Sequence, residues 1–342
     1  MPNAKMEKST EVCFLKMLVL GSSLMPDLLH LKEQFDDQGY VVVEDVLSPD
    51  VIAALETDYS QLLDKHVPRW LADGHIPDAF ADLPLHQRAG QIISHLNSEE
   101  FRWFDIAFPQ AKKPMGQLPN FSAAVFDLLV NPSLLDCIEV LIGGEILVNP
   151  IHHVRIKPPQ AGLKSAKPSG LMKSTGWHQD LGVARSVADD TDMITAWVAI
   201  TDATEENGCL CVVPRSHHAL TTHCTTNGVT IPEALIEQQA VRAIPVKRGG
   251  VLLMHRQLQH SSLENKSDGI RWSFDLRYQP VGQPTGRDEF PSFIARSRSN
   301  PASVTVDRAA WRALWQQTET WLQAQDVFEK SHRWSGDAEV CA

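Results

Sequence analysis

The sequence predicts a mainly β protein, a sandwich or barrel of short strands with helices before and after it. Between residues 146 and 280, short runs of β-branched and aromatic residues are separated by Gly, Pro, Asn and Asp. Many short strands with turn residues between them are typical of a sandwich or barrel, whereas a parallel sheet would need helices in between. The 342 residues are 43% hydrophobic, so a core of ordinary size can form.

Helices are predicted ahead of this region. A short strand is expected at Val41–Val43, and Ser48 and Pro49 then supply an N-cap and a first helical residue. Apolar residues at helical spacing mark the buried face of that helix: Val51, Ile52, Leu55, Tyr59, Leu62 and Leu63. Helix and loop continue to residue 145.

Strands are predicted at Leu147–Ile156, Trp177–Val183, Ile194–Ile200, Cys209–Val213, Val241–Val246, Val251–His255, Ser261–Glu264 and Arg271–Gln279. Pro158–Gly176 and about Leu220–Ala240 have the composition of loops, and we expect them to be mobile around a site. Another loop follows Pro284. A last helix is expected from about Asp307, with Trp311, Leu314, Trp315, Trp321 and Leu322 on one side.

These elements predict a single domain. We expect residues 1–28 to be a disordered extension, residues 29–330 to form the domain with its barrel core at about 146–280, and residues 331–342 to be a tail. The N-terminus loosely resembles a signal peptide, but Lys16 interrupts its apolar run, so a cytoplasmic protein is favoured. No apolar stretch approaches the ~20 residues that a membrane-spanning helix needs.

Charge and cysteine content argue against several classes of protein. Lys and Arg number 31 against 42 Asp and Glu, a net charge of -11, and no basic face for nucleic acid is evident. The six cysteines form no CxxC pair, so we expect reduced, buried thiols rather than a disulfide framework or a structural zinc site. The oligomeric state is left open.

A candidate metal site lies in the run Gly176-Trp177-His178-Gln179-Asp180. On a strand, His178 and Asp180 point to the same face, and a third nitrogen from a distant strand would complete the two-His, one-carboxylate set of non-haem Fe(II) oxygenases. By itself, such a tripeptide is more often a surface His–Asp pair. His260 is favoured as the third ligand, and His255 is the alternative because strand register can slip. A zinc hydrolase uses the same ligand types.

Longer stretches resemble the phytanoyl-CoA dioxygenase family. They are Gly176–Asp180, Glu206–His217 and His260 with Arg271, within a match from Phe35 to Pro280; Arg215 stands where the family usually has Gly. The resemblance implies a double-stranded β-helix, a cupin-like jelly roll with N-terminal helices and a C-terminal helix. It also implies a dioxygenase that uses Fe(II), dioxygen and 2-oxoglutarate, releasing succinate and CO2.

The resemblance assigns roles residue by residue. His178, Asp180 and His260 match the iron ligands, and Arg271 matches the partner of the distal carboxylate of 2-oxoglutarate. Ser262 and Trp197 match further co-substrate contacts. Another contact falls on the strand that contains His153 and Val154, and the register of that strand leaves either residue open. A guanidinium also suits a buried dicarboxylate on physical grounds, and a zinc hydrolase would not explain it.

The expected reaction is hydroxylation of an aliphatic C–H in a small lipid-like substrate or secondary metabolite. Related halogenases lack the carboxylate ligand, and Asp180 is present. Arg277 can be a surface strand arginine, but it lies six residues beyond Arg271, so both can face inward and only their position along the strand distinguishes them. We expect Arg277 to matter far less for the co-substrate than Arg271 does. The alternative to an enzyme is a non-catalytic jelly-roll binding protein that keeps the metal site.

Overall fold

Two β-sheets form the centre of the computed structural model, which describes residues 14–16, 24–108, 120–225, 228–325 and 333–341. The larger sheet has seven strands in the spatial order β1-β2-β7-β4-β9-β3-β10 and the smaller has the order β6-β5-β8. All described pairings are antiparallel except β1 with β2. The strands are β1 (Phe14–Lys16), β2 (Tyr40–Glu44), β3 (Glu145–Lys157), β4 (Ile194–Ala199), β5 (Leu210–Val212), β6 (Arg242–Ile244), β7 (Val251–His255), β8 (His260–Ser262), β9 (Arg271–Pro280) and β10 (Phe293–Ser297).

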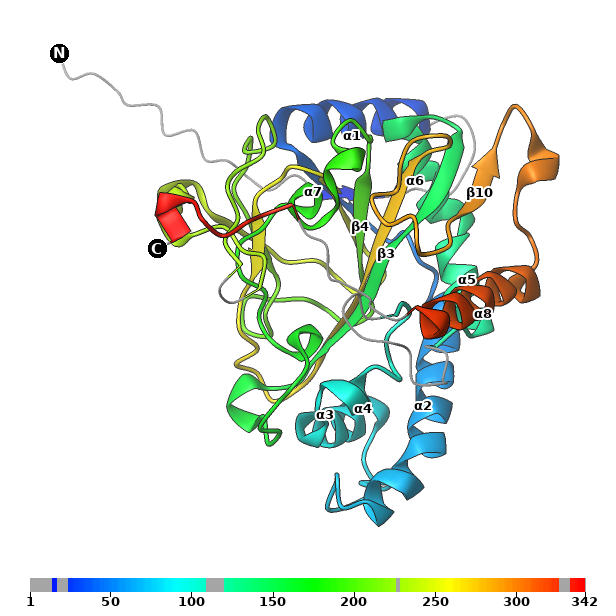
Figure 1. The fold of residues 1–342 in the computed structure, drawn as a ribbon, viewed down its shortest axis with the longest axis vertical. Helices are drawn as coiled ribbons and strands as arrows, with labels where there is room; N and C mark the ends of the chain where they lie inside the picture. Colours follow the sequence, from blue (N-terminus) through cyan, green and yellow to red (C-terminus); the bar gives the residue numbers. More distant parts are fainter. Residues whose placement is uncertain (1–13, 17–23, 109–119, 226–227, 326–332, 342) are drawn as a thin grey trace.

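Helices pack against the outer face of the larger sheet (Figure 1). They are α1 (Leu24–Gln38), α2 (Pro49–Ala72), α3 (Leu85–His95), α4 (Ser98–Phe101), α5 (Ala123–Leu129), α6 (Pro132–Ile142) and α8 (Arg308–Ala324). Ser48 caps α2 as expected, its Oγ accepting from Val51 N at 3.5 Å. The Tyr59 ring of α2 lies 4.7 Å from that of Trp272 on β9, which joins helix and sheet. Single 3-10 turns occur at Gln160–Gly162, Gly170–Met172, Ser186–Ala188, Glu233–Leu235, Gln238–Ala240, Pro301–Ser303 and Glu339–Cys341.

Alternation along the strands divides their side chains between two layers, since successive residues of a strand face opposite sides. In β2, Val41 and Val43 belong to the core under the helices, whereas Tyr40 and Val42 belong to the core between the sheets. On β9 the helix side takes Trp272, Phe274, Leu276 and Tyr278, and the inner side takes Arg271, Ser273, Asp275 and Arg277. The space between the sheets is therefore lined with charged groups along β9.

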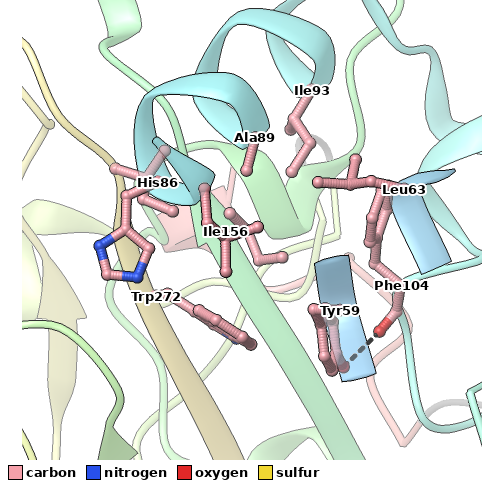
Figure 2. Close-up of a pocket in the computed structure, with 10 residues that line it drawn as sticks. Tyr59, Leu63, His86, Ala89, Ile93, Phe104, Ile156 and Trp272 are labelled. Carbon is pink, nitrogen blue, oxygen red and sulfur yellow. Dashed lines mark hydrogen bonds between the residues drawn. The ribbon is translucent and has the colours of Figure 1, made fainter. Parts of the chain in front are cut away.

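Figure 2 shows an apolar pocket on the outer face, between α2, α3 and the sheet. Ile156 and Trp272 contribute from β3 and β9, and the Tyr59 hydroxyl donates to the carbonyl of Phe104 at 2.8 Å beside it. Because Ile156 and Trp272 alternate with Lys157 and Arg271, this pocket lies on the opposite face of the sheet from the charged residues. It belongs to the core that joins helices and sheet.

The strand predicted at Trp177–Val183 does not form. His178 makes a single β-bridge with His260, and α7 (Asp180–Val183) follows at once. The reason is a long-range contact: Gln179 N donates to a side chain far away in the sequence, His223 Nε2, at 2.9 Å instead of to a neighbouring strand. The loop expected after Pro284 contains strand β10, which pairs with β3. Among the described residues the strands do not close into a barrel.

The ends of the chain also differ from expectation. β1 pairs with β2, and α1 starts at Leu24, although both fall within the expected disordered extension; residues 1–13 and 17–23 of it lie outside the described part. Asp307 caps α8 as expected, but Trp321 is 48% exposed. Trp311, Trp315 and Leu322 are spaced at the helical period and form the buried face of α8. Trp321 lies outside that face. None of the described helices is both long and apolar enough to cross a membrane.

Candidate active site

His178, Asp180 and His260 come together between the two sheets. One ligand atom of each lies within 4.8 Å of the others, and all three residues are buried. His178 and His260 are held by reciprocal backbone hydrogen bonds of 2.9 Å, and their ring centroids are 4.2 Å apart. Asp180 is the first residue of α7, so a turn rather than a strand brings it beside His178.

Each histidine presents Nε2 toward the centre of this group. Nδ1 of His178 donates to the carbonyl of Gly176, and Nδ1 of His260 donates to that of Leu258, both at 2.9 Å. A backbone acceptor at one nitrogen fixes the neutral tautomer with a lone pair on the other, which is how metal-binding histidines are usually oriented. Burial and the neighbouring His260 lower the pKa of His178 to about 3, so its ring is neutral.

Arg277 is not a surface residue. It is 4% exposed and its Nη2 forms an ion pair with Oδ1 of Asp180, while the Thr195 hydroxyl donates to Oδ2. Burial alone would raise the pKa of Asp180, but Arg277 holds it below its ordinary value. The carboxylate is therefore ionised and fixed at both oxygens. Of the two positions that the sequence left open for Arg277, surface or interior, the structure has the interior one: Arg277 and Arg271 face the same side of β9, as their even spacing allows.

Buried hydrogen-bond donors without acceptors mark the far end of the same space. Arg271 is fully buried; its Nε donates to the carbonyl of Gly208 at 3.2 Å and its Nη1 to Oγ of Ser273 at 2.7 Å. Among the described residues, neither its Nη2 nor Nε1 of Trp197 has a hydrogen-bond partner. The ring of Trp197 lies 5.2 Å from the guanidinium carbon of Arg271. Trp197 also lines the pocket that contains the three candidate ligands, so the two groups of residues are continuous.

Lys157 is a buried cation, although the sequence favoured a solvated charge near the mouth of the site for it. It is fully buried opposite Arg271 in the pairing of β3 with β9, and its Nζ donates to Oγ of Ser262 at 2.5 Å. Burial, then Arg271 and Arg155, lower its pKa well below the ordinary value. Oγ of Ser262 also accepts from Thr175 N at 2.7 Å, which leaves the hydroxyl hydrogen free to be donated.

Arg155 and Asp275 form an ion pair in the middle of the pocket. Nε of Arg155 donates to Oδ2 of Asp275 at 2.5 Å, and both residues line the pocket with the candidate ligands. Within the part of the chain that the structure describes, no carboxylate pairs with Lys157 or Arg271. With Lys157 protonated, three cations therefore face a single carboxylate, and the region carries an excess of positive charge.

His153 and His255 lie outside this pocket. Nδ1 of His153 is 2.9 Å from Oδ2 of Asp105, and its side chain is 24% exposed. The ring of His255 is 5.1 Å from that of His217 and is not among the residues grouped around Asp180. The inward-facing residue that β3 contributes next to Arg271 is Lys157.

His223 is a residue that the sequence analysis missed. Its Nε2 accepts from the backbone of Gln179, between the two candidate ligands, and its Nδ1 donates to the carbonyl of Thr221 at 2.8 Å. Burial lowers its pKa to about 4, so the ring is neutral as this bonding requires. It lies in a segment with the composition of a loop, where no local pattern distinguishes it.

Comparison with known proteins places this site in a family. Residues 35–273 match the family described as phytanoyl-CoA dioxygenase (PhyH). The chain is 25% identical over 280 residues to phytanoyl-CoA dioxygenase domain-containing protein 1 from Danio rerio, covering 70% of this chain and 85% of that protein. It is 28% identical over 299 residues to an ectoine dioxygenase from Sphingopyxis alaskensis, covering 80% and 84%.

A solved structure has the same fold. It is described as the non-heme monooxygenase ThoJ, and it aligns with a TM-score of 0.52 and 20% identity over 86% of this chain and 98% of its own. The expected cupin-like fold is thereby confirmed, although its strands do not close into a barrel here. The matched family and the assembled His, Asp and His residues agree. The chain therefore belongs to the phytanoyl-CoA dioxygenase family and is an iron- and 2-oxoglutarate-dependent dioxygenase.

Proposed function

We propose that the enzyme hydroxylates an aliphatic C–H of a small lipid-like substrate or secondary metabolite. His178, Asp180 and His260 hold the iron, and Arg271, Lys157, Ser262 and Trp197 hold the distal carboxylate of 2-oxoglutarate. The observation that carries the proposal is the set of buried donors without acceptors next to three convergent ligands. Bound iron supplies the oxidising chemistry, in which dioxygen and 2-oxoglutarate are consumed and succinate and CO2 are released.

The donor set fits iron. Two neutral imidazoles and one carboxylate are the ligands of non-haem Fe(II) oxygenases, which leave further positions open. Among the described residues, Nε2 of His178 and of His260 makes no hydrogen bond, although Nε2 of His178 lies 4.0 Å from Oδ1 of Asp180. The carboxylate of Asp180 accepts one hydrogen bond at each oxygen, so lone pairs remain on all three groups. The hydrogen bonds to Gly176 and Leu258 keep the rings directed inward without help from the metal.

The donors fit a dicarboxylate. A buried donor without an acceptor costs roughly 1–3 kcal/mol, and the place of Nη2 of Arg271 and Nε1 of Trp197, both without a partner among the described residues, beside the candidate ligands supports a ligand there. The hydroxyl of Ser262 can donate to the same oxygens. The excess positive charge near Lys157 would be neutralised by the two carboxylates of 2-oxoglutarate. The cations thus orient the co-substrate by one end, while its other end faces the candidate iron ligands.

A small apolar substrate is supported by the wall of the pocket. Leu210, Met254 and Trp197 line it along with the charged residues, so an aliphatic group can lie near the ligands. The similarity to a dioxygenase named for one small molecule, ectoine, supports a small substrate as well. A cytoplasmic location stays a prediction.

The test is co-substrate turnover. Metal-free protein is loaded with Fe(II), and succinate is measured with 2-oxoglutarate alone and with panels of small aliphatic substrates under isotopically labelled dioxygen. We expect succinate release and, with the right substrate, gain of one labelled oxygen atom. The control is His178→Ala, which should release none.

Three results would contradict parts of this proposal. Absence of succinate under all conditions would favour a binding protein with a metal site. Loss of two hydrogens without gain of oxygen would make the enzyme a desaturase. If His178→Ala releases as much succinate as the wild type, the iron is not bound by the residues named here.

A further inference from the structure

The C-terminal segment Arg333–Cys341 lies against the turn that carries Asp180. In Figure 1 this segment runs away from α7 toward the C-terminus. Nε1 of Trp334 donates to the carbonyl of Gly182 in α7 at 2.7 Å. Arg333, with a side chain only 7% exposed, forms an ion pair with Asp189 just beyond α7. The segment is therefore attached to the chain directly after the metal-ligand pair.

Trp334 also contacts the other support of this turn. Its ring stacks on that of His223, with centroids 5.0 Å apart and an interplanar angle of 24°. His223 in turn accepts from Gln179 N, between His178 and Asp180. A Cβ added to Gly182 would come within 2.4 Å of the His223 ring, so the close approach of these two segments requires glycine. Trp334 thus holds the turn both directly and through His223.

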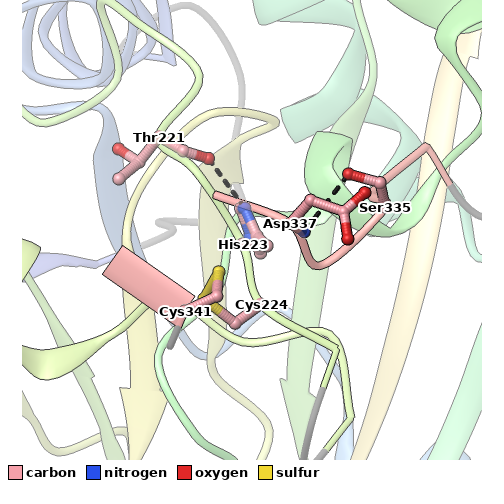
Figure 3. Close-up of a disulfide and its surroundings, with 6 residues drawn as sticks. All are labelled: Thr221, His223, Cys224, Ser335, Asp337 and Cys341. Atoms are coloured by element: carbon pink, nitrogen blue, oxygen red, sulfur yellow. Dashed lines mark hydrogen bonds between the residues drawn. A yellow bond between two sulfur atoms is a disulfide. The ribbon is translucent and has the colours of Figure 1, made fainter. Parts of the chain in front are cut away.

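A disulfide also links the C-terminal segment to the residue after His223. Cys224, next to His223, is bonded to Cys341, 117 residues later in the sequence. Figure 3 shows His223 beside this bridge, with Asp337 and Ser335 of the segment close by. The expectation of reduced cysteines is therefore wrong for this pair, whereas Cys137, Cys209 and Cys211 are buried thiols outside any disulfide. Cys224 and Cys341 form no local motif, and only the fold brings them together.

We propose that Trp334 is a positioning residue of the iron site and that the Cys224–Cys341 disulfide holds it in place. This inference rests on the iron site proposed above. Ordering of the segment is coupled to ordering of the turn Gln179–Val183, because each supplies the other's hydrogen bonds and ring contacts. A chain with the bridge intact then binds metal more tightly than a chain with the bridge open.

The bridge makes this coupling sensitive to redox conditions. A dithiol reductant delivers two electrons and two protons, converting the disulfide into two thiols while the dithiol itself becomes a disulfide. Such reductants keep cytosolic thiols reduced, whereas disulfides persist in oxidising compartments. The state of the metal-ligand turn therefore depends on the surroundings of the enzyme.

The test measures Co(II) binding to the full-length, metal-free protein by absorption titration. Trp334→Phe keeps an aromatic ring but loses the hydrogen bond to Gly182. One such bond corresponds to roughly a two- to tenfold change in the equilibrium it supports. We expect Co(II) affinity to fall by that factor and hydrogen exchange of residues 179–183 to accelerate. Trp321→Phe is the matched control, because that ring is exposed on α8.

The bridge is tested on the same readouts. A phosphine reductant opens it, giving two thiols and a phosphine oxide whose oxygen comes from water. Reduction should weaken Co(II) binding of the wild type and leave Cys341→Ala, already weakened, unchanged. The proposal is overturned if Trp334→Phe and the reduced protein both keep the Co(II) affinity and the hydrogen-exchange rates of the wild type. It is also overturned if either change lowers Tm but leaves the Co(II) affinity unchanged. If the wild type itself binds no Co(II), or His178→Ala binds it normally, the iron site is what fails.

Discussion

Replacing Lys157 by methionine should stabilise the free protein and weaken its response to 2-oxoglutarate. Lys157 is fully buried, and within the described part of the chain its Nζ donates a hydrogen bond only to the Ser262 hydroxyl, with Arg271 on the opposite strand. Exchanging buried charges for apolar groups of similar size typically stabilises a protein by about 1–4 kcal/mol. At about 2.1 cal/mol/K per residue, the 342 residues give an unfolding entropy of about 0.7 kcal/mol/K, so we expect Tm to rise by about 1.5–6 °C.

The ligand response should change in the opposite direction. With an inert divalent metal bound, 2-oxoglutarate at 100 times its Kd should stabilise the wild type by about 2.7 kcal/mol, or about 4 °C. Losing one charge-assisted hydrogen bond costs about 1.5–3 kcal/mol, which is roughly ten- to 150-fold in affinity. At the same concentration Lys157→Met should then gain about 2 °C or less.

Differential scanning calorimetry with and without 2-oxoglutarate measures both quantities in one series. Lys65→Met is the control, because Lys65 is exposed on α2 and neither quantity should change. The reasoning is refuted if Lys157→Met keeps the full shift with 2-oxoglutarate. A lower Tm in the free variant would show that the ammonium is well compensated in the folded protein.

Three further outcomes are expected. Asp180→Ala should lose Co(II) binding in a titration while keeping its circular dichroism spectrum, whereas His255→Ala should bind Co(II) normally. Loss of Co(II) binding in His255→Ala would mean that the third ligand is His255 rather than His260. Arg277→Met leaves the buried Asp180 carboxylate unpaired, so urea unfolding should show a loss of about 3–5 kcal/mol, and a neutral result would mean that the pair is not formed. Burial lowers the pKa of His152 to about 3 from 6.5, so below pH 6.5 the unfolded chain binds a proton that the folded chain does not. Stability should therefore fall as pH decreases from about 6.5 toward 3, by up to ~1.4 kcal/mol per pH unit for this group; His152→Phe should reduce the slope of Tm against pH, and an unchanged slope would count against it.

The elements that the sequence predicted well are those with a local physical signal. The helix from Pro49 was marked by its cap and by apolar residues at helical spacing, and β7 at Val251–His255 was marked by a run of apolar residues. The failures lie where a distant group replaces the local partner. His178 and Asp180 leave the expected strand because the side chain of His223 takes the hydrogen bond that a neighbouring strand would have taken.

The charged residues show the same division. Arg277 and Lys157 look like surface residues in the sequence, since a strand with alternating polar positions reads the same whether its polar face meets water or a second sheet. Burial then leaves each charge either paired, as Arg277 is with Asp180, or with a strongly lowered pKa, as Lys157 has.

The sequence by itself determined the chemistry available at the site. Two histidines, a carboxylate and an arginine, within stretches that resemble one enzyme family, were sufficient to predict iron and 2-oxoglutarate. Only the tertiary structure decided which other groups share their surroundings: Lys157 beside Arg271, Arg277 on Asp180, and a C-terminal segment bound by Trp334 and Cys341. Ligand type is a property of single residues, whereas burial, unpaired donors and a bridge between Cys224 and Cys341 depend on contacts between segments far apart in the chain.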